Sequence, residues 1–226
     1  MIELLDVRYS YPRGAEALRG VALTIREGIT SLVGPNGSGK TTILKISAGL
    51  LRPAAGQVLV DGSDLWSSDP EERLRLRRSV VYVHESPVVM RGTVEENVAF
   101  GLRLRGVPDE ETREGVREAM EMLGLSQLAS ASARALSAGQ RQLVALARAL
   151  AVSPRHLLLD EPTANLDREN RRRVARVLRT LAREGVSVAV ATHDRLLALE
   201  ISDRAVLIED GLVAAEGGPS EVLEGL

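Results

Sequence analysis

One run of the sequence has the residue types and the spacing that bind phosphate groups. Residues 34–42 read GPNGSGKTT, which matches the pattern G-x-x-x-x-G-K-[ST]. Its glycines let backbone N–H groups turn toward phosphate oxygens, Lys40 adds a compact charge for the terminal phosphates, and Thr41 offers a hydroxyl to Mg²⁺. An ordinary glycine-rich turn is the alternative, but it leaves unexplained why Lys40 is one of only two lysines among 29 basic residues. The expected nucleotide contacts are Gly34, Pro35, Asn36, Gly37, Ser38, Gly39, Lys40, Thr41 and Thr42.

A second run, HLLLDEPTANLD over 156–167, carries two adjacent carboxylates. A buried strand over 157–159 would deliver Asp160 to the carboxyl end of a sheet, where ligands bind in open α/β folds. We expect Asp160 to hold a metal ion directly or through water, and Glu161 to orient or deprotonate an attacking water molecule. An acidic turn after a strand is the competing interpretation, and the phosphate loop elsewhere in the chain favours the metal site.

A third run, ALSAGQRQ over 135–142, has the features of a helix start. Ser137 is a good N-cap, and Gly139 leaves the backbone accessible in the first turn. The N-terminus of a helix can bind an anion, although in isolation this run would indicate no more than a helix cap.

Hydrophobic patterning predicts the elements that would position these runs. Rough alternation predicts strands over 2–9 and 18–25, and apolar residues at helical spacing predict helices over 41–51 and 137–150. Short apolar strands that alternate with helices indicate an α/β fold whose mostly parallel sheet is covered on both faces, with the helical stretch 93–150 inserted. The other expected strands cover 29–33, 58–60, 80–83, 156–159, 186–191 and 205–208.

The composition excludes several classes of protein. The 226 residues hold 29 Lys and Arg against 31 Asp and Glu, a net charge of −2, which argues against nucleic-acid binding driven by bulk positive charge. With no cysteine, disulfides and thiolate chemistry are excluded. No apolar stretch is long enough to span a bilayer, and the first residues do not form a secretory signal. We therefore expect a soluble intracellular globular protein.

Together, these runs and their order resemble the ATP-binding subunits of ABC transporters over nearly the whole chain. GPNGSGKTT resembles the family's phosphate loop, LSAGQ its signature motif and LLLDE its second nucleotide motif. Residues 164–167 are similar to its D-loop, and residues 192–194 to its switch histidine. The resemblance implies a P-loop NTPase core with a mostly parallel sheet, an N-terminal antiparallel β part and an inserted helical subdomain.

The resemblance also implies how the chain is divided and assembled. A single domain over 1–226 would consist of a nucleotide-binding core, 1–91 and 154–226, and a helical subdomain, 92–153. ATP and Mg²⁺ would be the cofactors of a head-to-tail homodimer with two ATP molecules at its interface. Each nucleotide would lie between the phosphate loop of one subunit and the signature helix of the other. The signature residues expected to contact it are Ser137, Gly139 and Gln140.

Two further residues receive roles from the resemblance. His193 would contact the γ-phosphate and sense its presence, and like Glu161 it is a candidate catalytic residue; a partly buried polar residue is the alternative interpretation. Tyr11 lies where the family stacks an aromatic ring on adenine, with Tyr9 as the competing candidate. For Tyr11 the alternative is an aromatic residue in a turn at the end of a strand.

The sequence departs from the family pattern at two positions. Glu85 stands where the family usually has glutamine. A carboxylate still offers an oxygen to Mg²⁺ but adds negative charge beside the triphosphate, so we expect slower turnover or a changed metal preference relative to glutamine. Glu85 is thus a candidate catalytic residue and, with Thr41 and Asp160, a candidate metal ligand. Ala138 replaces a common glycine, and one methyl group at a helix start should have little effect.

An apolar loop indicates a partner. Residues 88–90 (VVM) follow Pro87 in a loop that cannot easily bury them, and in the family a membrane permease inserts a short helix here. A packing cluster within the chain is the alternative. We expect permease subunits to contact residues 85–105, an extracytoplasmic solute-binding protein to take part indirectly, and the chain to lie at the cytoplasmic face of the membrane. Residues 91–107 resemble importers more than exporters.

The expected function is therefore an ATP-hydrolysing subunit that powers solute transport by a separate permease. The alternative is a soluble ABC-type switch acting on DNA or the ribosome, but the span from Glu85 to Ser137 is too short for the long coiled coils of the DNA-acting forms. A phosphate-loop kinase or GTPase would have no use for the signature motif. Seven arginines over 168–184 are interpreted as the exposed face of an amphipathic helix, because Val174 and Leu178 mark an apolar stripe, and not as a nucleic-acid site.

Overall fold

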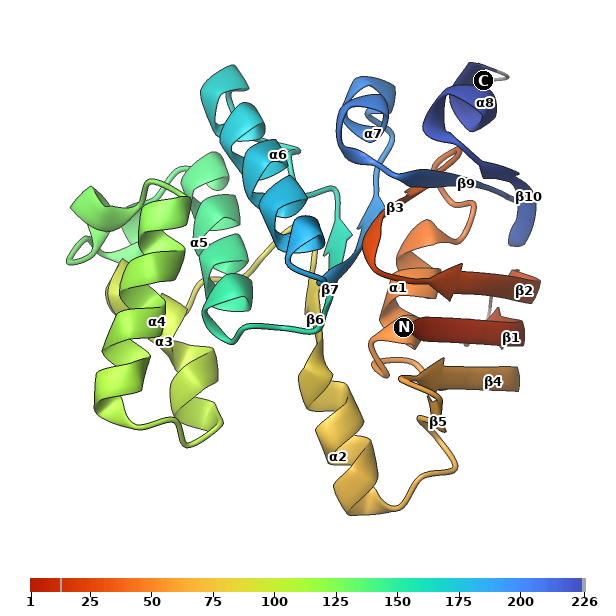
Figure 1. Ribbon diagram of the computed structural model, residues 1–226, viewed down its shortest axis with the longest axis horizontal. Helices are drawn as coiled ribbons and strands as arrows, with labels where there is room; N and C mark the ends of the chain where they lie inside the picture. Colours follow the sequence, from red (N-terminus) through yellow and green to blue (C-terminus); the bar gives the residue numbers. More distant parts are fainter. Residues whose placement is uncertain (13, 225–226) are drawn as a thin grey trace. The chain divides into compact units, whose positions relative to one another are not determined.

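The computed structural model describes residues 1–12 and 14–224, which belong to two compact units (Figure 1). The first unit comprises Met1–Tyr82, Arg155–Glu161 and Leu178–Leu226. The second comprises Val83–Pro154 and Pro162–Val177.

The strands form two sheets. The antiparallel sheet has the order β2-β1-β4-β5, and the larger sheet has the order β10-β9-β3-β8-β7-β6. In the larger sheet β3 pairs in parallel with β8 and β9, β7 pairs in parallel with β8, and β10 is antiparallel to β9. The strands are β1 (Ile2–Ser10), β2 (Glu16–Ile25), β3 (Gly28–Val33), β4 (Ala55–Val60), β5 (Ser63–Asp64), β6 (Val80–Val83), β7 (His156–Asp160), β8 (Ser187–Ala191), β9 (Arg204–Glu209) and β10 (Leu212–Gly217).

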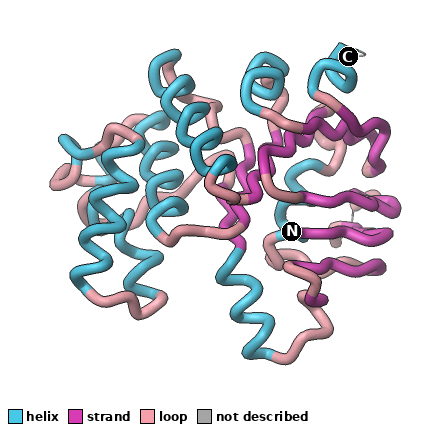
Figure 2. Tube along the Cα trace, viewed as in Figure 1, coloured by secondary structure: helices cyan, strands magenta, loops and turns pink. Residues whose placement is uncertain are grey.

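From β3 onward, helices alternate with single strands or pairs of strands along the chain, except at α3, α4 and α5, which follow one another. Figure 2 distinguishes the helices from the strands. Two 3₁₀ turns, Ser126–Leu128 and Ala133–Ala135, precede the helix that carries the signature-like run. The helices are α1 (Lys40–Ser47), α2 (Pro70–Ser79), α3 (Val94–Leu104), α4 (Asp109–Met122), α5 (Ala138–Ala151), α6 (Arg168–Arg183), α7 (Arg195–Ile201) and α8 (Pro219–Glu224).

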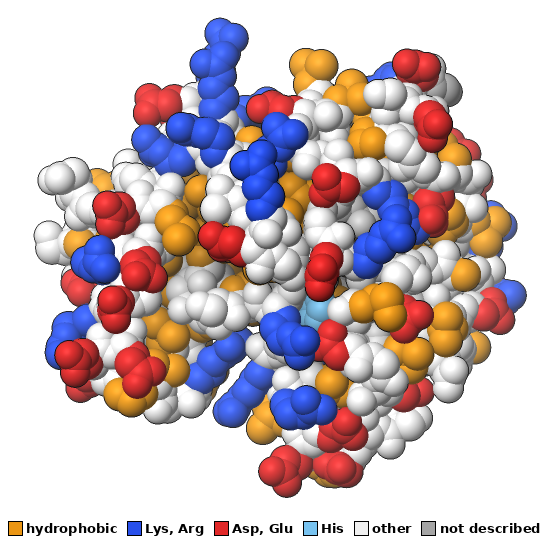
Figure 3. Space-filling model, in the orientation of Figure 1, with side chains coloured by type: hydrophobic (Ala, Val, Ile, Leu, Met, Phe, Trp, Pro, Cys, Tyr) orange, Lys and Arg blue, Asp and Glu red, His pale blue; other side chains and the backbone are white. Residues whose placement is uncertain are grey.

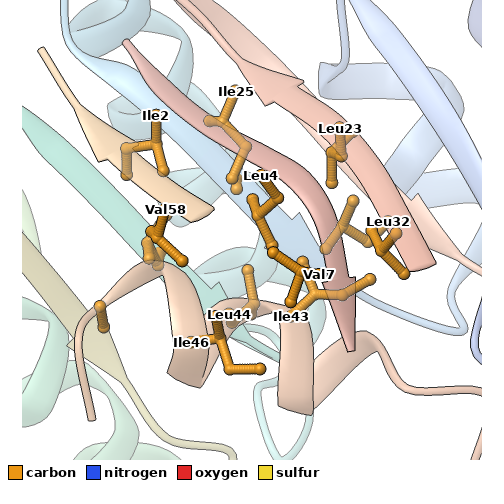
Figure 4. Packing of buried hydrophobic residues seen from close by; sticks show 14 of the residues in the cluster. Ile2, Leu4, Val7, Leu23, Ile25, Leu32, Ile43, Leu44, Ile46 and Val58 are labelled. Atoms are coloured by element: carbon orange, nitrogen blue, oxygen red, sulfur yellow. The ribbon is translucent and has the colours of Figure 1, made fainter. Parts of the chain in front are cut away.

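A core of aliphatic side chains holds α1 against the strands of the first unit. Ile43 and Ile46 of α1 are fully buried and pack in one cluster with Leu4 of β1 and Val58 of β4 (Figure 4). A smaller cluster lies around α7 and α8, whose apolar residues pack against β3 and β9. Helices on both faces explain why the central strands consist almost entirely of buried residues.

Two elements differ from the sequence prediction. The helix expected over 41–51 ends at Ser47, because Gly49 adopts a left-handed conformation with φ of 66°. Helix α2 was not predicted at all, since only Leu76 of this helix is buried and no apolar stripe marks it. Its signal is local: Asp69 caps two backbone N–H groups, and Pro70 occupies the first turn.

In the second unit, α3, α4 and α5 pack together. Capping boxes begin α3, at Thr93 and Glu96, and α5, at Ser137 and Gln140. None of the described helices is both long enough and apolar enough to span a membrane.

Helix α6 has the two faces that the sequence predicts. Val174 and Leu178 are buried, while basic side chains gather on the exposed surface over this helix (Figure 3).

Candidate functional site

The phosphate-loop run forms the turn between β3 and the N-terminus of α1. Gly39, the N-cap of α1, has φ of 111°, and a Cβ there would lie 2.9 Å from the carbonyl oxygen of Ala17. Gly34 has φ of 137°, and a Cβ there would press against the carbonyl oxygen of Ile208. Only glycine suits such positions, so these residues are required by the close approach of the loop to its neighbours.

Lys40 lies over this loop. Its Nζ donates hydrogen bonds to the carbonyl oxygens of Gly34 (2.7 Å) and Pro35 (2.8 Å). Burial lowers the pKa of Lys40 from its usual value, while the negative charges of Glu161 and Asp160 oppose that shift. The amine is thus a buried cation held by neutral carbonyl groups, and a phosphate oxygen is a stronger acceptor for it.

The loop fits an anionic ligand by three observations. The N-cap of α1 makes no side-chain hydrogen bond, so the first N–H groups of the helix are left for an external acceptor. The hydroxyl of Ser38 is buried and has no hydrogen-bond partner among the described residues. A Cβ at Gly37 would meet no atom within 4 Å, so the tip of the loop faces open space.

Asp160 lies at the end of β7 and is buried. Its Oδ2 accepts hydrogen bonds from Thr41 Oγ1 (2.8 Å) and from the hydroxyl of Tyr82 (3.1 Å). The structure therefore brings the start of α1 to the acidic end of β7, although Thr41 and Asp160 are 119 positions apart. Tyr82 was missed by the sequence analysis, because its place in a strand says nothing about where its hydroxyl points.

Glu161 follows with φ of 46°, and its N–H donates to the carbonyl oxygen of Ala191 (2.9 Å). Its Oε2 accepts a hydrogen bond from Thr192 Oγ1 (3.0 Å). Its Oε1 accepts one from the backbone N–H of His193 (2.9 Å) and lies 2.7 Å from Nδ1 of that residue. Two separately predicted candidates, Glu161 and His193, are thus in direct contact, and Thr192, to which the sequence analysis assigned no role of its own, contacts the same carboxylate.

Tyr11 contacts the phosphate loop through its hydroxyl, 3.2 Å from Thr42 Oγ1. The rings of Tyr11 and Tyr9 meet edge to face with 5.0 Å between centroids. Tyr11 is the more exposed of the two and has the side-chain contact to the loop, whereas Tyr9 packs against the core.

The signature-like run begins α5 in the second unit. The backbone N–H of Gln140 donates to Ser137 Oγ (3.2 Å), and the Ser137 N–H donates to Gln140 Oε1 (2.9 Å). A Cβ at Gly139 would lie 2.6 Å from the carbonyl oxygen of Asn165, so the D-loop-like run packs on the first turn. Glu85 belongs to the same unit and is exposed.

The N-termini of α1 and α5 share an electrostatic property. Every other α-helix in the described chain has an acid in its first turn or, for α7, the acid Asp194 as N-cap. An acid there stabilises a helix end but would repel a phosphate. These two helix ends are thus the ones suited to an added anion.

The donor set suits Mg²⁺ held partly by a nucleotide. Among the described residues no cluster of three or more histidine, cysteine, aspartate or glutamate side chains could form a complete metal site. Mg²⁺ needs none, since it is commonly bound by one or two carboxylates, water and substrate phosphates. Thr41 and Asp160 offer protein oxygens beside the phosphate loop.

Residues predicted for the site thus fall into two groups. The first unit brings together Tyr11, the loop 34–42, Asp160, Glu161 and His193. The second unit holds Ser137, Gly139 and Gln140 at one helix end and Glu85 in a loop.

Comparison with known proteins identifies the family. The family model described as ABC transporter matches residues 18–164. The energy-coupling factor transporter ATP-binding protein EcfA of Methanothermobacter thermautotrophicus is 38% identical over 98% of this chain and 72% of its own. CbiO1 of Clostridium perfringens, described as part of the ABC transporter complex CbiONQ, superposes with a TM-score of 0.87 at 30% identity, covering 99% of this chain and 90% of that one.

A third similar protein, the ABC transporter cassette MJ0796, was solved as a dimer. It matches with a TM-score of 0.90 at 33% identity over 97% of this chain and 99% of its own. The same cassette was solved in a post-hydrolysis state bound to ADP and Pi. The fold predicted from the sequence is confirmed by these matches. The chain belongs to the ABC transporter family, as one of its ATP-binding subunits.

Proposed function

We propose that this chain binds ATP with Mg²⁺, hydrolyses it as a head-to-tail homodimer and thereby powers a separate membrane permease. The observation that carries the proposal is the junction in the first unit. There the phosphate loop is hydrogen-bonded to Asp160, and Glu161 next to it holds His193. Groups suited to bind phosphate, to ligate a metal ion and to accept a hydrogen bond from water therefore lie together in the first unit, which supports the proposal.

In this proposal each group has one task. Lys40 exchanges its two carbonyl acceptors for the terminal phosphates, and the N–H groups at the start of α1 bind the phosphates beside them. Thr41 and Asp160 would hold Mg²⁺, which would supply positive charge to the phosphate oxygens, and Glu85 is kept from the sequence as a proposed further ligand. Tyr11 stacks on the adenine ring, oriented by its hydroxyl contact to Thr42.

Glu161 accepts the hydrogen bond that orients the attacking water. The water oxygen forms the new bond to the γ-phosphorus and gives a proton to Glu161. The bond between that phosphorus and the β–γ bridging oxygen breaks, and ADP leaves with the bridging oxygen. His193 turns from Glu161 to the γ-phosphate, so the presence of that phosphate frees the carboxylate for the water. Thr192 keeps the other oxygen of Glu161 in place during this exchange.

The second copy completes the site. Ser137, Gly139 and Gln140 of that copy would approach the γ-phosphate from the side opposite Lys40, because the start of α5 carries no acid and is exposed. The phosphate then binds both copies, and hydrolysis removes the group that joins them.

The contact with the permease would lie on residues 85–105. Val88 is 78% exposed, yet its carbonyl accepts a hydrogen bond from Arg148 (3.1 Å). Asn97, which is buried, exchanges hydrogen bonds with the backbone of Met90. The loop is therefore fixed while Val88 stays open, which suits a docking surface.

The relatives indicate the class of transporter. EcfA is named as an ATP-binding protein of an energy-coupling factor transporter, and CbiO1 is described as part of the ABC transporter complex CbiONQ. We infer a subunit of the energy-coupling type, peripheral at the cytoplasmic face of the membrane, whose transported solute is selected by its permease.

Dimer formation tests the proposal most directly. Glu161→Gln keeps the shape of the side chain but removes the carboxylate, so the variant should bind ATP and remain a dimer in MgATP, as measured by light scattering after size exclusion. The wild-type chain should be a dimer only transiently and should release phosphate. A Glu161→Gln chain that stays monomeric at saturating MgATP would contradict the proposal.

A second measurement tests the permease surface. Val88→Glu should abolish co-purification with a polytopic membrane partner and leave ATP hydrolysis intact. Leu74→Glu on α2 is the matched control, because Leu74 is also exposed and lies in the other unit.

A further inference from the structure

Tyr82 contacts the carboxylate proposed to hold the metal ion, yet no motif marks this tyrosine. It lies in β6, the neighbour of β7 in the sheet, and its hydroxyl donates to Asp160 Oδ2 at 3.1 Å. Thr41 donates to the same oxygen at 2.8 Å. Oδ2 therefore has both lone pairs engaged, whereas Oδ1 makes no hydrogen bond within the part of the chain that the structure describes.

We propose that Tyr82 is a positioning residue for metal binding: its hydroxyl holds Oδ2 of Asp160 and so leaves Oδ1 as the oxygen available to Mg²⁺ or to a water on it. The inference rests on the proposed function, in which Asp160 and Thr41 hold the metal ion. Tyr82 itself touches neither the cation nor the nucleotide in this account.

The two donors to Asp160, Thr41 and Tyr82, differ in whether they would also ligate the metal ion. Thr41 gives its proton to Asp160 and has lone pairs left, so it can keep this hydrogen bond while it ligates Mg²⁺. Its position then depends on the cation. Tyr82 does not ligate the cation in this account, so its hydrogen bond can hold the carboxylate both before the cation arrives and afterwards.

Packing makes the Tyr82 hydroxyl a fixed donor. The ring is partly buried and packs against the main hydrophobic cluster, which limits its rotamers. Asp160 is 4% exposed, so water contributes little to holding its carboxylate. A carboxylate in such surroundings depends on protein donors for its orientation.

The experiment separates the hydroxyl from the ring. Binding of the non-hydrolysable ATP analogue AMP-PNP is measured by calorimetry, once with Mg²⁺ and once with EDTA, for the wild-type chain, Tyr82→Phe and Tyr82→Leu. The ratio of the two dissociation constants gives the gain in affinity that Mg²⁺ provides. We expect Tyr82→Phe to bind as the wild type does in EDTA and to lose about threefold to tenfold of the Mg²⁺-dependent gain, the size expected for one hydrogen bond.

The other outcomes are distinct. If only the ring mattered, Tyr82→Phe would match the wild type and Tyr82→Leu alone would be impaired, and the proposal would be wrong. Equal weakening of Tyr82→Phe with and without Mg²⁺ would indicate a structural role and would also overturn it. If the wild-type chain itself gained nothing from Mg²⁺, the assignment of Asp160 and Thr41 would fail first; if it bound no nucleotide, the proposed function would fail as a whole.

Discussion

The helices α1 and α5 begin with the same set of free backbone N–H groups and satisfy them differently. At α1, Gly39 provides no side-chain cap, and the loop before it curls around open space. At α5, Ser137 and Gln140 satisfy each other's backbone N–H groups in a capping box. Neither first turn contains an acid. The first end is open to an anion as it stands, and the second has to exchange its own cap for one.

This difference gives the two ends different affinities for phosphate. An anion at α1 gains hydrogen bonds and the charge of Lys40 without displacing any side-chain cap. An anion at α5 has to compete with a cap that is typically worth about 1 kcal/mol. A single chain should therefore bind nucleotide at α1 alone, and α5 of a second copy should join only when the phosphate is already held.

The largest expected effect comes from removing the positive charge at the start of α1. Lys40→Ala removes the one cation that the loop presents, so nucleotide binding should be lost, as measured by calorimetry with ATP. Lys45→Ala is the matched control: it removes the other lysine of the chain, in the last turn of the same helix, and should bind ATP normally. Near-normal affinity of Lys40→Ala would show that the phosphates bind elsewhere.

The self-capped end should respond in two separable ways. Ser137→Ala should cost about 1 kcal/mol of folding free energy through loss of the cap, and it should weaken MgATP-dependent dimers of a Glu161→Gln chain by about tenfold through loss of a donor to a charged phosphate.

Thr93→Ala at the capping box of α3 is the matched control for Ser137→Ala. It should cause a similar loss of stability in urea unfolding and leave the dimer unchanged in sedimentation experiments. Equal effects of both variants on dimerisation would mean that the start of α5 is only a cap.

A smaller effect is expected from the charge of Glu85, which is proposed as a metal ligand. Glu85→Gln removes a negative charge, so turnover with Mg²⁺ should rise by about twofold to tenfold and the half-saturating concentrations of Mg²⁺ and Mn²⁺ should change. Glu110→Gln, at an exposed glutamate of α4 in the same unit, should change neither. Identical kinetics for Glu85→Gln and the wild type with both metals would contradict the role proposed for Glu85.

The open end was predictable from the sequence because its determinants are local. In the sequence, a short apolar run, glycines at fixed spacing and a lysine predict a strand, a tight turn and a helix start. The structure has β3, the loop and α1 in that order. The end of α1 was less predictable: apolar spacing continues to Leu51, but Gly49 interrupts the helix.

Contacts between side chains of distant segments could not be predicted from the sequence in the same way. Asp160 was expected near the phosphate loop, because strand ends in a parallel sheet share one edge. The hydroxyl of Tyr82 reaches Asp160 across 78 positions, and no periodicity reports such a side-chain direction. The hydrogen bonds from Lys40 to the carbonyl oxygens of its own loop could not be predicted either, because they depend on the path of the folded backbone.

The last expected effect concerns pH, and it determines the pH at which the variants at the two helix ends should be compared. His156 begins β7, is 2% exposed, and contacts Asp61 through Nε2 (3.1 Å) while its Nδ1 has no partner among the described residues. Burial lowers the pKa of His156, and the charges of the Met1 ammonium and Arg155 lower it further, against the opposing charge of Asp61.

Because the pKa of His156 in the folded chain lies below its unfolded value, the unfolded chain binds a proton first as the pH falls. The associated stability is present above about pH 6.5 and is lost as the pH falls below it, by at most about 1.4 kcal/mol per pH unit for one proton. Urea unfolding at pH 7.5 and 5.5 should show this loss for the wild type and less of it for His156→Leu. The same loss in both proteins would assign the pH effect to other groups. The stabilities of Ser137→Ala and Thr93→Ala should accordingly be compared at pH 7.5. At that pH His156 contributes little to the difference between the folded and unfolded chain, so the comparison reports the helix caps.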